Sequence, residues 1–269
     1  MRLRQLEQLT ALEEVLDAGT VRHLEALGVD EGWRCLEAGA GGGSIARWLS
    51  ERVGRDGHVL AIDLDTRFAE GALLHQRNSA VVQCDLLQAD LPEAVFDLVH
   101  ARCVLAWLPR PSHAIARLVD SLRPDGWLVA EEMDFISMAD NSRLEAALSA
   151  RLTHMIGAFK SVLERGRLFD ATFGRRLPAE LEAAGLARVR AEGRVGIWRG
   201  GGAGGRLWRS TLDQYREVLT NSGLVNQEDI DSVIGLCDEP CLQLMSPVTM
   251  AAWGRRPSLP GRKDAVNHV

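Results

Sequence analysis

Apolar and polar positions along the first half of the chain switch repeatedly between a helical and a strand-like spacing. Leucines recur at helical spacing from Leu3 to Leu16, which predicts a helix that ends near Gly19 and a second, short helix from Thr20 to Leu27. Beyond them, short apolar runs predict strands, and helical patterns lie between most of these runs. The expected strands are 33–38, 58–63, 80–84, 96–101 and 127–133, and the expected helices are 44–53, 67–75 and 112–122.

The order of these elements predicts the fold class. Strand, helix and strand follow each other as in parallel βαβ units with right-handed crossovers. The strands are almost continuous apolar runs, as in a sheet whose two faces are both covered by helices. Thr66 and Ser112 are expected to cap the N-termini of the helices predicted at 67–75 and 112–122. We predict an α/β fold with a doubly wound, seven-stranded, mostly parallel sheet whose last strand is antiparallel.

The pattern changes after residue 137. A helical stripe over 139–165 predicts an inserted helix, and the alternation in 187–198 predicts a strand. A glycine-rich segment, 199–205, lacks the Gly-Lys-Ser/Thr ending of a phosphate loop, and we interpret it as a flexible connector. The remaining expected elements are helices at 175–184, 206–221 and 227–237 and a last strand at 241–253.

The segment from Glu37 to Gly43, between the first strand and the next helix, carries the chemistry. Its glycines let the backbone turn sharply and let a ligand approach the main chain, while free N–H groups at the helix start face that ligand. Asp63 follows about 20 residues later at the end of the next strand, where a carboxylate accepts hydrogen bonds from both ribose hydroxyls. The sequence therefore predicts a site for an adenosine-type ligand.

The acid before the glycines indicates which ligand this is. Glu37 would repel a pyrophosphate, but it suits a ligand that carries an ammonium and a sulfonium group. An acid followed by glycines at alternate positions, here Gly39, Gly41 and Gly43, resembles the first motif of the class I S-adenosylmethionine-dependent methyltransferases. Later segments resemble further motifs of this family, and the resemblance covers 32–134; these segments are 59–65, 81–92, 96–109 and 122–132.

The resemblance implies a Rossmann-like methyltransferase fold and S-adenosyl-L-methionine as the cofactor. Asp63 is then the ribose acid, and Asp85 would receive the adenine amino group. The cofactor contacts that it implies are Glu37, Ala38, Gly39, Gly41, Gly43, Asp63, Leu64, Asp85, Leu86, Ala101 and Arg102. The corresponding division of the chain is an N-terminal helical lid (1–29), a cofactor-binding core (30–136), a helical cap insertion (137–175), the rest of the core with the last two strands (176–255) and a flexible tail (256–269).

For the reaction, the resemblance implies methyl transfer to oxygen, nitrogen or carbon. The apolar stripes and Trp107 indicate that the acceptor is a small hydrophobic molecule, of the kind found in specialised metabolism. Alignment and exclusion of water supply most of the catalysis, and a base is needed only if the acceptor must lose a proton. The candidate bases are His154 on the inserted helix and Glu132 near the end of the fifth strand, whereas His100 is interpreted as a core residue. Trp107 and His154 are candidate acceptor contacts, since Trp107 replaces a histidine that relatives often carry.

Composition excludes other classes of function. The net charge of −6 argues against a nucleic-acid partner. Five cysteines without a C-x-x-C pair indicate a reducing, cytoplasmic location, and the 1–19 segment is not expected to be a signal peptide. No apolar stretch reaches the length of about 18 residues that spans a bilayer. Asp140-Asn141 imitates part of a metal site, but Ala101-Arg102 occupies its other place, so we expect no metal. The oligomeric state is left as monomer or homodimer.

Two alternatives remain open. The chain could be a member of the fold that keeps the cofactor or its demethylated product bound and catalyses another reaction, such as a cyclisation. It could also be an NAD-dependent reductase, which predicts thermal stabilisation by NADH.

Overall fold

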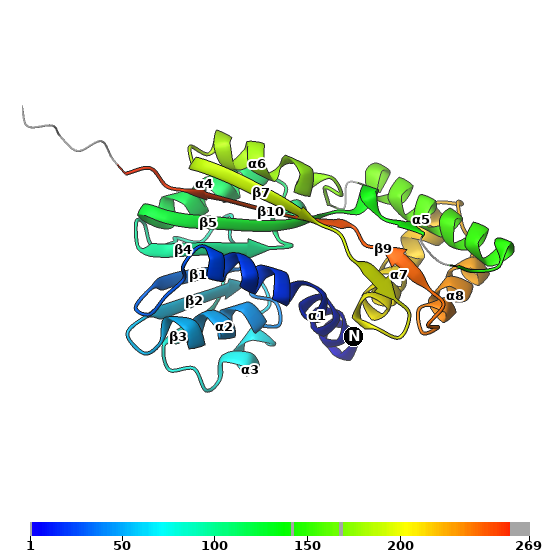
Figure 1. Cartoon of the computed structure of the whole chain (residues 1–269), viewed down its shortest axis with the longest axis horizontal. Helices are drawn as coiled ribbons and strands as arrows, with labels where there is room; N and C mark the ends of the chain where they lie inside the picture. Colours follow the sequence, from blue (N-terminus) through cyan, green and yellow to red (C-terminus); the bar gives the residue numbers. More distant parts are fainter. Residues whose placement is uncertain (1, 141–142, 167–168, 259–269) are drawn as a thin grey trace, which may run out of the picture.

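The computed structural model describes residues 2–140, 143–166 and 169–258, and its centre is a seven-stranded sheet (Figure 1). The strand order is β3-β2-β1-β4-β5-β10-β7. Neighbouring strands from β3 to β5 are parallel, and β10 is antiparallel to both of its neighbours. The predicted doubly wound, mostly parallel sheet with an antiparallel last strand is therefore confirmed. The bounds are β1 Arg34–Ala38, β2 His58–Asp63, β3 Ser79–Gln83, β4 Phe96–Arg102, β5 Leu122–Asp134, β7 Ala187–Arg194 and β10 Val248–Arg255.

Helices cover both faces of this sheet (Figure 1). On one face, Leu24 of α1 and Leu49 of α2 belong to an apolar cluster with strand residues such as Val129. On the other face, Ile115 of α4 and Leu177 of α6 belong to a second, larger cluster. Burial on both faces explains why the strands are continuous apolar runs. The helices are α1 Arg2–Ala26, α2 Ser44–Val53, α3 Ala69–Leu73, α4 Pro111–Ser121 and α6 Phe173–Ala183.

A helical lobe lies beyond the end of the sheet at which β5 finishes (Figure 1). It consists of α5 Ala146–Gly166, α7 Ala203–Asn221 and α8 Gln227–Leu236, with a three-stranded antiparallel sheet of β6 Ala139–Asp140, β9 Gln243–Met245 and β8 Ile197–Arg199. Two short 3-10 helices, η1 Leu105–Trp107 and η2 Phe135–Ser137, follow β4 and β5. In the described ranges we find no helix with the length and apolarity needed to span a membrane.

The N-terminal helices predicted separately are one helix. α1 continues through Gly19, because that glycine is a packing position and not a helix end. A Cβ there would lie 1.4 Å from Nη1 of Arg194, so only glycine leaves room for the guanidinium. A glycine inside a helix costs only about 1 kcal/mol relative to alanine, which the long helix tolerates.

Both predicted helix caps are wrong. α3 begins at Ala69, and the Thr66 hydroxyl donates to the Glu70 carboxylate, 2.6 Å away, instead of capping the backbone. α4 begins at Pro111, which needs no N–H partner at the first helical position. The hydroxyl of Ser112 donates to Glu180 at 2.7 Å and ties α4 to α6.

Two predicted strands, 187–198 and 241–253, are each divided between the two sheets. Gly196 and Ser246 mark the division, and the Ser246 N–H donates to the Gly196 carbonyl at 2.9 Å. Pro247 follows and has no N–H for a sheet ladder. The inserted helix predicted from residue 139 begins at Ala146, because residues 139–140 pair with β9.

The glycine-rich segment is a packed structure and not the flexible connector that we predicted. α7 begins inside it, at Ala203. A Cβ on Gly204 would lie 2.2 Å from the Trp198 ring, and one on Gly205 would lie 2.6 Å from the Cys237 carbonyl oxygen. The glycines therefore let α7 pack closely against β8 and α8.

Candidate active site

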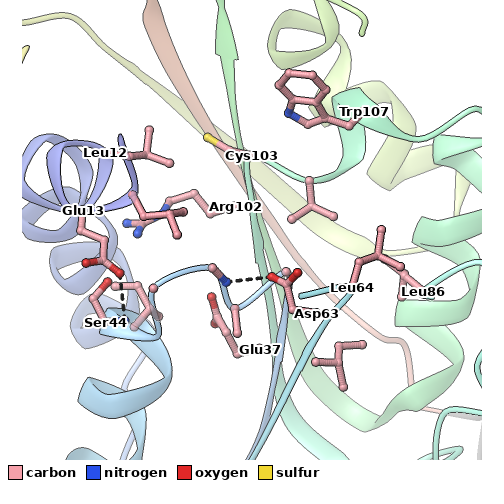
Figure 2. A pocket seen from close by; sticks show the side chains of 18 of the residues that line it. Leu12, Glu13, Glu37, Ser44, Asp63, Leu64, Leu86, Arg102, Cys103 and Trp107 are labelled. Atoms are coloured by element: carbon pink, nitrogen blue, oxygen red, sulfur yellow. Dashed lines mark hydrogen bonds between the residues drawn. The ribbon is translucent and has the colours of Figure 1, made fainter. Parts of the chain in front are cut away.

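A crevice of about 320 Å³ opens at the carboxyl ends of β1, β2 and β4 (Figure 2). Figure 2 shows Glu37 and Asp63 in its floor, Leu64 and Leu86 on one side, and Glu13 with Ser44 on the opposite side. The lining residues are Leu9, Leu12, Glu13, Glu37, Gly39, Ala40, Gly41, Gly42, Ser44, Ile45, Ile62, Asp63, Leu64, Cys84, Asp85, Leu86, Arg102, Cys103, Val104, Trp107 and Leu108.

The glycine loop needs glycine for its backbone. Gly39, Gly41 and Gly43 have φ values of 75°, 53° and 88°, in the left-handed region that other residues avoid. A Cβ on Gly39 would lie 2.0 Å from Cγ2 of Val104, which also lines the crevice. Val104 occupies the position that a Gly39 side chain would need, so the loop can pack against Val104 only with glycine here.

Asp63 is joined to the glycine loop. Its Oδ2 accepts a hydrogen bond from the Gly41 N–H at 2.8 Å (Figure 2). Its Oδ1 accepts a hydrogen bond from the Asp65 N–H at 2.9 Å. These bonds hold a carboxylate at the end of β2, beside the loop. Asp85 follows the end of β3 and also lines the crevice. Its carboxylate accepts hydrogen bonds from the Leu87 N–H and from the side-chain amide of Gln88.

Glu37 is a buried carboxylate oriented by a histidine. Its Oε2 lies 2.7 Å from Nδ1 of His100, which is fully buried and whose Nε2 lies 4.0 Å from Glu131. Glu37 is only 3% exposed, but it lines the floor of the crevice. A buried carboxylate needs partners, so a cationic group in the crevice would stabilise it further. His100 is not among the residues that line the crevice, as expected for a core residue.

Helix α1 closes the crevice through a polar network around Arg102. Nη2 of Arg102 lies 2.8 Å from Asp17, and Nη1 donates to the Thr20 hydroxyl at 2.9 Å. The Glu13 carboxylate accepts the Ser44 N–H at 3.3 Å, and burial raises the pKa of Glu13. The sequence analysis missed Leu9, Leu12 and Glu13, because their spacing is that of any amphipathic helix.

Most of the predicted cofactor contacts meet in the crevice. Eight of them line it, namely Glu37, Gly39, Gly41, Asp63, Leu64, Asp85, Leu86 and Arg102. Three do not, namely Ala38, Gly43 and Ala101. Ala38 and Ala101 are buried and face each other in the register of β1 and β4. Gly43 packs against Ala69 and Ala72 of α3.

A second cavity, of about 280 Å³, adjoins the crevice and lies among α1, η1 and the helical lobe. Seven aromatic side chains line it, and four residues, Leu9, Leu12, Cys103 and Trp107, border both spaces. Trp107 stacks on Phe169 with ring centres 4.6 Å apart. The lining residues are Gln8, Leu9, Leu12, Cys103, Ala106, Trp107, Glu132, Met133, Phe135, Phe159, Phe169, Trp198, Leu207, Trp208, Thr211, Gln214 and Tyr215. We call this space the aromatic cavity.

Glu132 is the carboxyl group in the wall of the aromatic cavity. Successive side chains of β5 lie on opposite faces of the sheet. Glu131 therefore contacts Thr20 of α1, whereas Glu132 lies on the opposite face and lines the aromatic cavity. Oε1 of Glu132 accepts the N–H groups of Val104, Leu105 and Ala106 at 2.9, 2.6 and 3.3 Å. Burial raises the pKa of Glu132 to about 7, against the lowering effect of these bonds.

His154 lies away from both spaces. Its side chain is exposed on α5, and Nε2 lies 2.8 Å from the carbonyl oxygen of Leu224. It lines neither the crevice nor the aromatic cavity, so the structure does not support it as a base or an acceptor contact. Its place on the polar edge of the apolar stripe of α5 explains the exposure.

Of the Asp140-Asn141 pair, which imitates part of a metal site, only Asp140 lies among the described residues. Asp140 accepts the Ser149 hydroxyl at 2.8 Å, whereas Asn141 lies outside the described residues. Within the described ranges, no group of three or more His, Cys, Asp or Glu side chains is arranged to hold a metal ion.

A seven-stranded sheet in this order, with an acid- and glycine-lined crevice at its carboxyl edge, is the Rossmann-like fold of the class I methyltransferases. Comparison with known proteins supports the same fold. Residues 36–130 match the family model described as a methyltransferase domain.

Curated relatives match over part of their length. A trans-aconitate 2-methyltransferase of Rhizobium leguminosarum is 30% identical over 54% of this chain and 56% of its own. Methyltransferase str3 of Strobilurus tenacellus is 27% identical over 56% of this chain and 52% of its own. The chain thus spans about half the length of these relatives.

A solved structure shows the same fold over nearly the whole chain. It is a phosphoethanolamine N-methyltransferase of Haemonchus contortus in complex with S-adenosylhomocysteine, 14% identical. The match has a TM-score of 0.57 and covers 93% of this chain and 57% of that one.

Proposed function

We propose that this chain is a methyltransferase that binds S-adenosyl-L-methionine in the crevice and methylates a small hydrophobic acceptor in the aromatic cavity. The observation that carries the proposal is the junction of the two spaces. A crevice whose floor carries the carboxylates of Glu37 and Asp63 meets an apolar, ring-lined cavity across a border of Leu9, Leu12, Cys103 and Trp107. A cationic nucleoside and an apolar acceptor would meet at this border.

The residues of the crevice fit the cofactor. Gly39 and Gly41 line the crevice without side chains, so a ligand can approach their backbone, and the buried Glu37 suits the ammonium group of the cofactor. Asp63 would bind the ribose hydroxyls, and Asp85 the adenine amino group. Leu64 and Leu86 would flank the adenine, and Ala38, Gly43 and Ala101 would shape the strand ends beneath it. Arg102 would act chiefly by fixing α1.

Catalysis by the protein would rest on alignment and dryness. The cofactor supplies a methyl group on a sulfonium sulfur, which is already an activated leaving group. We propose that the 1–29 segment is a lid, because Leu9, Leu12 and Glu13 of α1 cover the crevice. We likewise propose that the 137–175 segment caps the acceptor, because Phe159 and Phe169 line the aromatic cavity. Both segments would exclude water from the border, which favours methyl transfer.

The acceptor atom is proposed as oxygen or nitrogen. An apolar cavity with one carboxyl group suits a hydrophobic molecule that carries a single polar atom to be methylated. The alternative of a non-methylating enzyme has less support, because both curated relatives are named methyltransferases.

Isotope transfer tests the proposal. The protein is incubated with S-adenosyl-L-methionine labelled in the methyl group and with a panel of small ring compounds that carry hydroxyl or amino groups. We expect label in an extractable product and S-adenosylhomocysteine in equal amount. Turnover of an acceptor without label would favour the non-methylating alternative.

A further inference from the structure

The walls of the aromatic cavity favour a flat molecule. Its rings form a continuous series in which Trp107 stacks on Phe169, and Phe135 meets both Phe169 and Phe159 edge-on, with ring centres 5.4 and 6.1 Å apart. Trp208 and Tyr215 continue the series from Phe159. Ring faces and edges arranged in this way contact another ring well, whereas a branched aliphatic molecule would leave gaps.

A buried carboxylate oxygen in these walls has unused hydrogen-bonding capacity. All the hydrogen bonds between Glu132 and described residues end on Oε1, which leaves Oε2 for a molecule in the cavity. Glu132 is only 2% exposed, so its contact with bulk water is small. Buried polar groups are nearly always paired, which indicates that a bound molecule supplies the partner of Oε2.

Glu132 is also held at a useful place. The three N–H groups that bind Oε1 belong to the turn directly after Cys103, a residue that borders both the crevice and the aromatic cavity. Cys103 has φ of 56°, a strained value for a residue with a side chain, which the N–H bond to the Glu131 carbonyl at 2.9 Å helps to maintain. The Glu132 carboxyl group is therefore bonded to the residues that directly follow Cys103, beside the border of the two spaces. The methyl group would cross this border.

Building on the proposed function, we propose that Glu132 is the catalytic base and that the acceptor is a flat ring molecule whose hydroxyl group gives its proton to Oε2. The hydroxyl proton moves to Oε2, and the oxygen keeps the electron pair that forms its new bond to the methyl carbon. The electron pair of the broken carbon–sulfur bond stays on sulfur, and the Glu132 proton then leaves to water. The reaction is O-methylation of a hydroxylated aromatic compound.

The charges around Glu132 agree with this role. Burial raises its pKa to about 7, so the carboxylate is well populated near neutral pH while the group still holds a proton strongly. The other titratable groups near it are Glu131, whose charge acts in the same direction, the Cys103 thiol and the Tyr215 hydroxyl. Burial raises the pKa of both Cys103 and Tyr215, so neither competes as a base.

The test compares binding of 2-naphthol and naphthalene, which share their rings and differ by one hydroxyl group. The full chain is saturated with S-adenosylhomocysteine, and quenching of tryptophan fluorescence reports each ring, because Trp107, Trp198 and Trp208 line the cavity. We expect the wild type to prefer naphthol by about tenfold or more above neutral pH, as for a hydrogen bond to a charged group. This preference should shrink as the pH falls through the pKa of Glu132, while naphthalene binding stays constant.

Glu132→Gln keeps an oxygen for the turn N–H groups but replaces the free oxygen by an amide NH₂, so the preference should disappear. Glu93→Gln is the matched control, because it makes the same exchange at an exposed position that lines neither space. It should keep the preference. Methyl transfer from labelled S-adenosyl-L-methionine to naphthol should fall by about 100-fold or more in Glu132→Gln.

The outcomes separate the two proposals. A preference for naphthol that survives in Glu132→Gln, a wild type without preference, or no binding of either ring overturns the role of Glu132 and the acceptor class. Unchanged affinity of Glu132→Gln for S-adenosylhomocysteine shows that the variant is folded. A wild type that does not bind S-adenosylhomocysteine contradicts the proposed function itself.

Discussion

The ionisation of Glu132 has a consequence for stability that can be measured without any substrate. The fold raises the pKa of this carboxyl from 4.5 to about 7, chiefly by burial. The folded state therefore binds the proton more tightly than the unfolded state between these two values. Stability consequently falls as the pH rises through this range, and the loss is complete above the folded-state pKa. A difference of this size corresponds to about 3 kcal/mol when the group is fully ionised.

Glu132→Gln carries no titrating proton at this site, so the perturbation isolates the effect. Between about pH 5 and about pH 8, the wild type should lose about 2.5 kcal/mol of unfolding free energy relative to the variant. Urea denaturation of both proteins at the two pH values gives this difference, and other titrating groups cancel in it. Glu93→Gln, at an exposed position before β4, should follow the wild type at both pH values. If this difference in unfolding free energy changes by less than about 0.5 kcal/mol between the two pH values, or changes with the opposite sign, burial does not raise the pKa of Glu132.

Three further predictions concern the two spaces. Asp63→Ala should weaken S-adenosylhomocysteine binding by about 1–3 kcal/mol in calorimetry, while Asp56→Ala, in an exposed turn, should not; equal affinities would remove the ribose assignment. Gly39→Ala forces a Cβ onto Val104 at a positive φ and should abolish that binding, whereas Gly71→Ala has open space in α3 and should raise the melting temperature slightly; a Gly39→Ala protein with normal binding would contradict the loop geometry. Trp107→Ala removes the stack on Phe169 and should weaken 2-naphthol binding by about fivefold in fluorescence titration; an unchanged affinity would exclude Trp107 as an acceptor contact.

The core of the fold and the floor of the crevice could be predicted because their signals are local. A buried parallel strand has a short, continuous apolar run as its sequence pattern. Both β2 and α2 have the bounds that the sequence predicts. The glycine loop is likewise local, since positive φ at Gly39, Gly41 and Gly43 restricts the residue type. Asp63 is predicted from its place about 20 residues after Gly43, at the end of the next strand.

The aromatic cavity could not be predicted, because it is assembled from α1, η1, the end of β5 and the helical lobe. Phe159 and Tyr215 lie on helices whose apolar stripes are equally consistent with an ordinary core. The division of two predicted strands between sheets depends on contacts such as that between Gly196 and Ser246, which no local pattern encodes. The exposure of His154 depends on where α5 packs, and so does its exclusion from the site.

We propose that the crevice binds S-adenosyl-L-methionine and its demethylated product and does not bind a dinucleotide. Titration calorimetry of the wild type and Glu37→Gln with S-adenosylhomocysteine and with NADH tests it directly. We expect S-adenosylhomocysteine to bind the wild type and to bind Glu37→Gln about tenfold more weakly, because a charged partner of the ammonium is lost, and we expect no binding of NADH. Binding of NADH without binding of S-adenosylhomocysteine would show that the crevice is a dinucleotide site.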